Sequence, residues 1–102
     1  MIKSSSITVS IFMAGNSAMA AELCLNWYAE RGGCVTVTPT KYVYTGGQED
    51  GFIIGFINYP PHISNEDKIM KEAQLLAELL RVKLGQESYT IQGPTHTITY
   101  GR

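Results

Sequence analysis

The segment Phe52-Ile53-Ile54-Gly55-Phe56-Ile57-Asn58-Tyr59 is the most strand-like part of the sequence. Its apolar residues are nearly continuous, which is typical of a strand buried on both faces. Pro60-Pro61 ends the run, because proline cannot continue a strand ladder. We therefore expect a central strand of a sheet, covered on both sides.

The residues before this strand predict a hairpin. Residues 34–38 alternate and are rich in β-branched side chains, and Tyr42-Val43-Tyr44 resumes the extended pattern. Pro39 lies between these segments and is expected to shorten or bulge the strand. The connection is then a turn-rich loop over residues 45–51.

Two amphipathic helices are expected on either side of the hairpin. From residue 18 to 31 the apolar residues recur at steps of three and four, and Gly32-Gly33 ends the pattern. A second stripe runs from about residue 65 to 84, after a capping sequence that starts at Ser64. Gly85 is the expected C-terminal stop of this helix.

The two ends of the chain add short strands. Residues 7–13 alternate strictly, and residues 88–92 and 95–100 are two short strands around Gly93-Pro94. The order β-α-β-β-α-β-(β) predicts an α+β, ferredoxin-like split βαββαβ sandwich, with both helices on one face of a mainly antiparallel sheet. We expect one domain over residues 1–102, with residues 1–5 flexible. The expected core is Ile11, Leu23, Trp27, Ile54, Phe56, Leu76 and Leu80.

Composition excludes several classes of function. The chain has 102 residues, 44% hydrophobic and 17% charged, with a net charge of -1 and no long run of either sign. A nucleic-acid partner is not expected, because that needs a clustered basic face. No membrane span or signal peptide is expected, since the N-terminal strand alternates and the apolar runs are short. Two cysteines are too few for a disulfide scaffold, so the cytoplasm is the expected location.

Local catalytic and metal-binding motifs are not recognisable in the sequence. Cys24 and Cys34 match neither a C-x-x-C pair nor a zinc spacing, and both are interpreted as small core residues. No G-x-S-x-G or Walker A sequence occurs. The prediction is therefore a protein without enzymatic activity, cofactor or metal.

Two sets of residues are candidates for binding. Tyrosines on the sheet face that the helices leave open would suit protein contact, and the acidic pair of the 45–51 loop stands beside them. The candidate partner-binding residues are Tyr42, Tyr44, Gln48, Glu49, Asp50 and Tyr59. The alternative is ordinary sheet composition around a solvated turn.

The second set is Gly15, Asn16 and Ser17, a small-residue loop that enters a helix. Such a loop can bind an anion through free N–H groups. Every strand-to-helix turn has this geometry, so a simple helix cap is the alternative explanation.

Several segments resemble small accessory proteins of bacteriophages and prophages: residues 7–12, residues 46–51 with 57–60, and residues 85–89. Proteins of this type include anti-defence factors such as anti-CRISPR proteins. The resemblance implies a non-enzymatic protein that binds and inhibits a host protein or protein complex in the bacterial cytoplasm. It assigns no site residues.

Two further functional hypotheses stay open. One is a homo-oligomeric protein, a homodimer, that binds or sequesters a small anionic ligand such as a nucleotide signal in a pocket between protomers. The other, an enzyme of the small dimeric α+β type, has the least support in the sequence. Self-association is expected in either case, because two helices cannot cover all the apolar surface of so short a chain.

Overall fold

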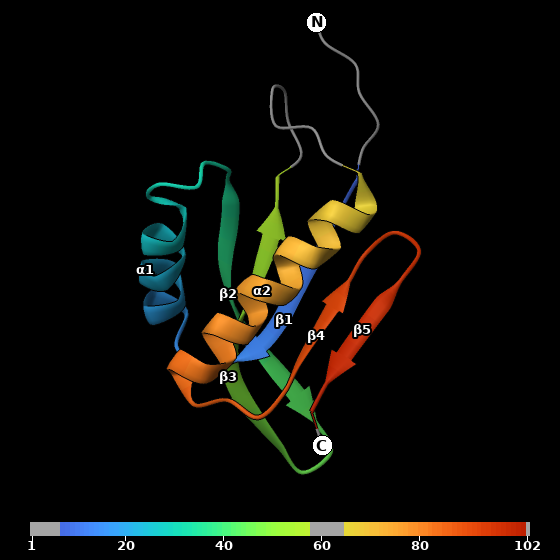
Figure 1. Ribbon diagram of the computed structural model, residues 1–102. Coiled ribbons are helices and arrows are strands. Elements are labelled where there is room, and N and C mark those ends of the chain that lie inside the picture. The colour runs from blue at the N-terminus through green and yellow to red at the C-terminus, as the bar shows by residue number, and fades with distance from the viewer. Residues whose placement is uncertain (1–6, 58–64, 102) are drawn as a thin grey trace, which may run out of the picture.

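The computed structural model describes residues 7–57 and 65–101, and within them two helices cover one face of a five-stranded sheet (Figure 1). In chain order the elements are β1 (Ser10–Ala14), α1 (Ser17–Tyr28), β2 (Val35–Tyr44), β3 (Gly47–Phe56), α2 (Glu66–Leu84), β4 (Tyr89–Gln92) and β5 (Thr97–Tyr100). The strand order is β2-β3-β1-β4-β5, and all four pairings are antiparallel. This confirms the predicted ferredoxin-like sandwich, with β5 added at one edge.

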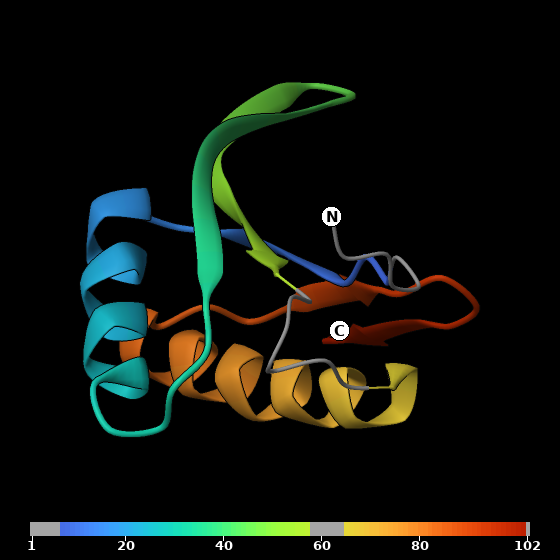
Figure 2. The ribbon, with the colours of Figure 1, turned by 90° about the horizontal axis from the view of Figure 1, so that it is seen from above.

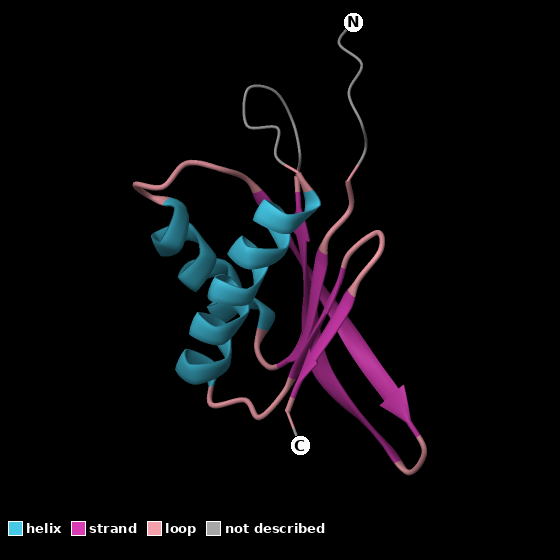
Figure 3. Ribbon diagram, turned by 45° about the vertical axis from the view of Figure 1, so that its right-hand side comes forward, coloured by secondary structure: helices cyan, strands magenta, loops and turns pink. Residues whose placement is uncertain are grey.

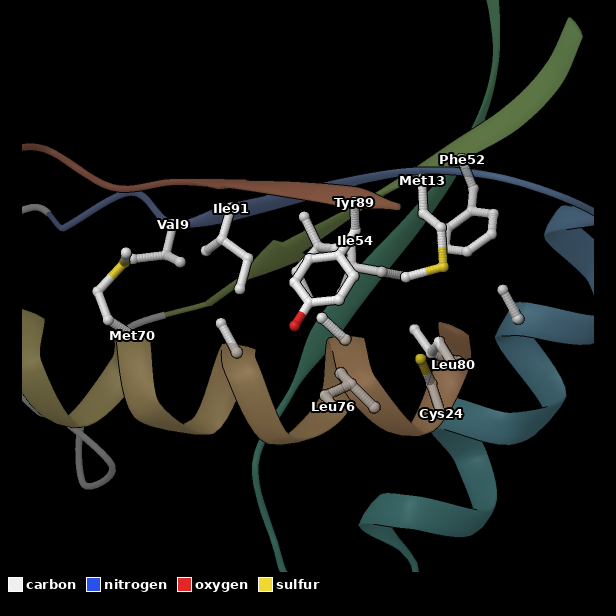
Figure 4. Packing of buried hydrophobic residues seen from close by; sticks show 14 of the residues in the cluster. Val9, Met13, Cys24, Phe52, Ile54, Met70, Leu76, Leu80, Tyr89 and Ile91 are labelled. Atoms are coloured by element: carbon white, nitrogen blue, oxygen red, sulfur yellow. The ribbon is translucent and has the colours of Figure 1, made fainter. Parts of the chain in front are cut away.

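The core lies between the sheet and the helices. Alternate residues of β1 and β3, among them Ile11, Phe52 and Ile54, are fully buried on the helix-covered face. Figure 4 shows Leu76 and Leu80 of α2 beneath these strands. Each fully buried side chain of this size stabilises the fold by roughly 1.5–3 kcal/mol relative to exposure. The two-residue period of the N-terminal strand therefore predicted the correct buried face.

Capping residues mark the start of both helices and the end of α2, whereas α1 ends at Tyr28, before the Gly32-Gly33 stop that the sequence predicted. Asn16 precedes α1 and its side chain accepts a hydrogen bond from the backbone N–H of Met19 at 3.0 Å. Asn65 does the same for α2 through Lys68 at 2.9 Å. Gly85 ends α2 in the left-handed region with φ +67°, as the sequence predicted.

The predicted loop over residues 45–51 is wrong. The hairpin turn is Thr45-Gly46, and the ladder continues from the pair Tyr44–Gly47 to the pair Val35–Phe56. Gly46 has φ +91°, which lets so short a turn close. Gln48, Glu49 and Asp50 are poor strand formers alone, and their pairing with β2 keeps them extended.

Two other expectations about the sheet are corrected. Pro39 does not interrupt β2, because β2 is an edge strand whose outer side has no ladder partner among the described residues. The strand expected at the centre, β3, is second from the edge, and β1 is central. The side of β3 that faces away from the helices is not fully covered, since Ile53 and Gly55 are half-buried.

The expected core is only partly correct. Ile11, Ile54, Leu76 and Leu80 are fully buried, whereas Leu23, Trp27 and Phe56 are partly buried and pack at the margin of the core. The first two lie on α1, which stands beside the edge strand β2 instead of across the centre (Figure 1). Cys24 is buried as expected, but Cys34 is exposed.

The face opposite the helices, which we call the open face, carries the other residues of the same strands. The last β1–β3 pair is Ala14–Gly51, so residues 41–50 project beyond β1 as an arm. Figure 2 shows this arm curving away from the helices, and Figure 3 shows that both helices lie on the other side of the sheet. No helix among the described residues is long and apolar enough to cross a membrane.

Candidate functional site

A pocket of about 480 Å³ lies where the arm leaves the sheet, and we call it the open-face pocket. The end of β1, the arm, and the ends of β4 and β5 form its walls. Four aromatic residues line it: Phe12 and Tyr42 turn their rings to the open face, whereas Tyr89 and Tyr100 line it from strand ends whose rings turn toward α2. Aromatic surface of this kind suits a flat, partly apolar ligand.

Polar groups are interspersed with these rings. Ser88, Thr90 and Thr99 bring hydroxyl groups to the open-face pocket, and Glu49 brings a carboxylate. Thr90 lies in β4, which pairs with β1, and its register partner is Phe12. The pocket therefore combines hydrogen-bonding groups, one negative charge and aromatic surface.

Tyr42 and Glu49 reach the pocket because they are direct cross-strand neighbours in the arm. The Tyr42 hydroxyl donates a hydrogen bond to the carbonyl of Phe52 at 2.7 Å, which lays the ring across Gly51. A Cβ at Gly51 would collide with the Tyr42 ring and lie 2.6 Å from the Met13 carbonyl oxygen. Burial raises the pKa of Tyr42, and the Glu49 carboxylate raises it further.

A second pocket of about 620 Å³ adjoins the first and is here called the helix-start pocket. The residues before α1, its first turn, the β2–β3 hairpin and the segment after α2 line this pocket. Its polar lining residues are Asn16, Ser17, Thr40, Asp50 and Gln86. Ala14 and Glu49 line both pockets, so Glu49 stands at their junction. The Gly15 N–H donates to the Asp50 carbonyl at 3.0 Å, which fixes the arm against the start of α1.

The predicted site residues fall into three groups. Tyr42 and Glu49 line the open-face pocket, while Asp50, Gly15, Asn16 and Ser17 line the helix-start pocket. Tyr44 folds over Gly47 near the tip of the arm, and Gln48 is exposed on the other side of β3. Tyr59 lies outside the described residues, as do residues 1–5.

Sequence reasoning missed most of the lining of the open-face pocket, since it named only Tyr42 and Glu49 of it. Phe12, Thr90 and Tyr100 come from strands far apart in the chain, and only the strand order brings them together. The sequence indicated these residues only through their place on predicted strands, where apolar residues recur with a regular period. Asn16 acts as the cap that the sequence offered as the alternative to an anion site.

Metal-binding geometry is lacking across residues 7–57 and 65–101, where no group of three or more His, Cys, Asp or Glu side chains could hold an ion. The two described cysteines are free, and burial raises the pKa of the Cys24 thiol to about 11. A thiol with so high a pKa is a poor nucleophile at neutral pH.

Comparison with known proteins gives two solved structures that are similar over the whole chain. One is described as a phage SAM lyase in complex with S-methyl-5'-thioadenosine, with a TM-score of 0.74, 13% identity, and coverage of 100% of this chain and 96% of that chain. The other is a phage SAM lyase in the apo state, with a TM-score of 0.69, 12% identity and the same coverage. Identity this low shows the fold alone. No protein-family model and no curated protein matches the chain.

These matches overturn the functional prediction from sequence. The expected non-enzymatic inhibitor of a host component is wrong, because the similar structures are of an enzyme that acts on a small molecule. The nucleotide-sequestering alternative is not favoured for the same reason. Nothing supports the expected host-protein partner, the homodimer or the anti-CRISPR likeness. The predicted resemblance to phage accessory proteins is supported in its broader form, since both matches are phage proteins.

Proposed function

We propose that this chain is an enzyme of the SAM lyase type, which cleaves S-adenosylmethionine (SAM) and releases S-methyl-5'-thioadenosine. The observation that carries the proposal is the open-face pocket in a fold that matches such an enzyme from end to end. The lining of the pocket suits each chemical part of this substrate.

The adenosine part of SAM fits the aromatic side of the open-face pocket. Adenine is flat and aromatic, and it packs well against Phe12 or Tyr42. The ribose hydroxyls need donors and acceptors, which Thr90 and Thr99 supply from neighbouring strands. The nucleoside is the part that substrate and product share, so both bind here.

The sulfonium of SAM carries a positive charge, and Glu49 is the carboxylate at the junction of the two pockets. Coulomb attraction then favours SAM over the neutral thioether product. Because this charge disappears during cleavage, Glu49 stabilises the bound substrate more than the transition state. Its role is substrate binding and product release.

The amino-acid end of SAM then enters the helix-start pocket. An α-helix leaves its first N–H groups without intrahelical partners, and Asn16 satisfies only that of Met19 by its side chain. The N–H groups of Ser17 and Ala18 favour the substrate carboxylate, while Asp50, an exposed carboxylate whose Oδ1 lies 3.2 Å from Lys41 Nζ, favours its ammonium group. The untested sequence prediction of an anion site at Gly15, Asn16 and Ser17 becomes part of this proposal.

A lyase reaction on SAM needs no added water or base. A carboxylate oxygen of the substrate forms a bond to its own γ-carbon, the bond from that carbon to sulfur breaks, and the electron pair stays on sulfur. The products are S-methyl-5'-thioadenosine and a cyclic ester of the amino acid. A positive and a negative charge disappear together, so surroundings less polar than water favour the transition state. Binding and orientation are then sufficient, which fits a chain without a nucleophile–base motif.

Removal of SAM suits an accessory protein of a phage. SAM is a methyl donor in the cytoplasm of the host, and its loss would deprive every host enzyme that depends on it, defence enzymes included. The expected cytoplasmic location belongs to this proposal.

The test is to incubate the purified full chain with SAM in ¹⁸O-labelled water and follow the products by mass spectrometry. We expect S-methyl-5'-thioadenosine in a one-to-one ratio with an unlabelled four-carbon product at early times. Absence of S-methyl-5'-thioadenosine refutes the proposal, and ¹⁸O in the early four-carbon product would make the enzyme a hydrolase instead.

A matched pair of variants locates the reaction. Thr90→Phe fills the open-face pocket, whereas Thr38→Phe adds the same ring to the open face of β2, outside the pocket lining. We expect at least a tenfold loss of turnover with the first variant only. Equal activity of both variants would remove the reaction from this pocket.

A further inference from the structure

Tyr100 lies between two pockets and lines both of them. It lines the open-face pocket, and it also lines a pocket of about 460 Å³ near the C-terminus with Arg81 and Gln86. Its ring lies on the α2 side of the sheet, as does the ring of its register partner Tyr89, so contacts of the ring fix the end of β5 that forms this part of the open-face pocket wall.

The strand that carries Tyr100 does little to fix this ring. β5 has four residues, lies at the sheet edge and pairs only with β4 among the described strands. Tyr100 is its last residue and is 44% exposed. Strand ends of this kind fray readily, so the ring needs contacts beyond the ladder to stay in one place.

Two neighbours supply such contacts. The ring of Tyr89, the register partner of Tyr100, is stacked on it with centroids 5.3 Å apart and an angle of 10° between the planes. The guanidinium carbon of Arg81 lies 4.8 Å from the centroid of Tyr100, which is cation–π distance. The ring is thus held by one residue of the sheet and one residue of α2.

Arg81 is itself held rigidly. Its guanidinium donates to the Glu78 carboxylate through Nε at 3.1 Å and through a second, shorter hydrogen bond from Nη2. Its Nη1 donates to the Gln86 carbonyl at 3.4 Å. The Tyr89 hydroxyl donates to the same carboxylate at 3.2 Å. Glu78 therefore links both neighbours of Tyr100 through hydrogen bonds.

We propose that Glu78 and Arg81 are positioning residues for the nucleoside subsite, and that they act by holding Tyr100 at the pocket wall. This inference rests on the proposed SAM-cleaving function. Neither side chain lines the open-face pocket, so both act through Tyr100 and not on the substrate. A displaced wall weakens contacts that substrate and transition state share, which raises KM and leaves kcat unchanged.

The experiment compares Arg81→Gln with Lys83→Gln, which removes the same charge from the same last turn of α2 at an exposed position. For SAM cleavage by Arg81→Gln we expect KM to rise about fivefold, with kcat within twofold of the unaltered chain, as expected for loss of one cation–π contact. The Kd of S-methyl-5'-thioadenosine should rise by the same factor. Lys83→Gln should change neither, and Arg81→Lys should recover part of the loss.

A double variant tests whether Arg81 acts through Tyr100. Tyr100→Leu removes the ring, and adding Arg81→Gln to it should then weaken S-methyl-5'-thioadenosine binding no further. Additive losses, or an Arg81→Gln variant that binds with unchanged Kd, would overturn the positioning role while SAM cleavage by the unaltered chain stands. If the unaltered chain neither cleaves SAM nor binds S-methyl-5'-thioadenosine, the proposed function fails and the positioning role fails with it. Melting curves of each variant identify any loss that comes from unfolding.

Discussion

The helix-covered face and the open face of the sheet take alternate residues of the same strands. In β1, Ile11 and Met13 face the helices and are almost fully buried, while Phe12 faces the other way and is half-buried. In β4, Ile91 faces the core and Thr90 faces the open-face pocket. One face is uniformly apolar and close-packed, and the other mixes rings, hydroxyls and a carboxylate around a pocket. The stability of this chain and its proposed chemistry are thus placed on opposite sides of one sheet.

The largest expected effect is on the helix-covered face. Leu76→Ala removes a fully buried side chain of α2 and should lower the free energy of unfolding by about 2–5 kcal/mol. Leu75→Ala, at the neighbouring position with 60% exposure, should change it by less than about 0.5 kcal/mol. Denaturant titrations of the two variants check the pair, and equal losses would contradict the assignment of the buried face.

Gly51 is where the two faces depend on each other. A Cβ there meets the backbone carbonyl of Met13 as well as the Tyr42 ring, so Gly51→Ala should destabilise the chain by about 1–3 kcal/mol and displace Tyr42. At Gly55, on the same side of β3, the added Cβ meets only the Thr36 side chain within 3 Å, and that side chain can rotate. Thermal unfolding should rank Gly51→Ala well below Gly55→Ala, and the reverse order would show that the arm adjusts freely.

A change at Glu49 is expected to affect substrate binding but not the stability of the fold. Glu49→Gln removes the carboxylate at the junction of the two pockets and should raise KM for SAM about tenfold, or ~1.4 kcal/mol, without lowering kcat. The melting temperature should stay the same, because Glu49 is exposed. Glu22→Gln makes the same change on an exposed position of α1 and serves as the control. Steady-state kinetics in which both variants match the unaltered chain would remove Glu49 from the site.

The smallest expected effect is on acid stability. The Glu66 carboxylate accepts hydrogen bonds from Thr95 and lies 3.4 Å from His96 Nδ1, and these contacts, that of the Thr95 side chain above all, lower its pKa below 4.5. A lowered folded-state pKa adds stability above the unfolded value, and this stability is lost as the pH falls through the folded value. Glu66→Gln should therefore make the free energy of unfolding fall less steeply below about pH 4.5. Asp67→Asn, at the next residue, should leave more of this pH dependence in place. Urea titrations between pH 3 and 6 check this, and an unchanged slope for Glu66→Gln would contradict it.

Periodicity explains why the fold was predictable. The alternation of residues 7–13 and the stripe of α2 each bury one face, and Asn16 and Gly85 cap helix ends where the sequence placed them, whereas the N-cap of α2 is Asn65, one residue after the expected start of the capping sequence. The arm was not predictable in the same way. Gln48, Glu49 and Asp50 resemble loop residues by composition, and only pairing with β2 makes them a strand.

The site was predictable only in its local parts. Tyr42 and Glu49 were selected as neighbours of one turn, and they do face one pocket. Thr90, Thr99 and Tyr100 complete that pocket from the other end of the chain, and no local pattern links them to Glu49. The proposed enzymatic function leaves no signal in the sequence, because a substrate that supplies its own nucleophile would require no catalytic motif. A search for such motifs therefore finds nothing in a chain of this kind.

The most direct test of the contrast between the faces is to map S-methyl-5'-thioadenosine on the isotope-labelled full chain by NMR titration. We expect the largest chemical-shift changes at Phe12, Tyr42, Glu49 and Thr90, with the α2 core residues Leu76 and Leu80 almost unchanged. Shifts confined to the helical layer, or none at millimolar ligand, would contradict the assignment of the open face as the site of function.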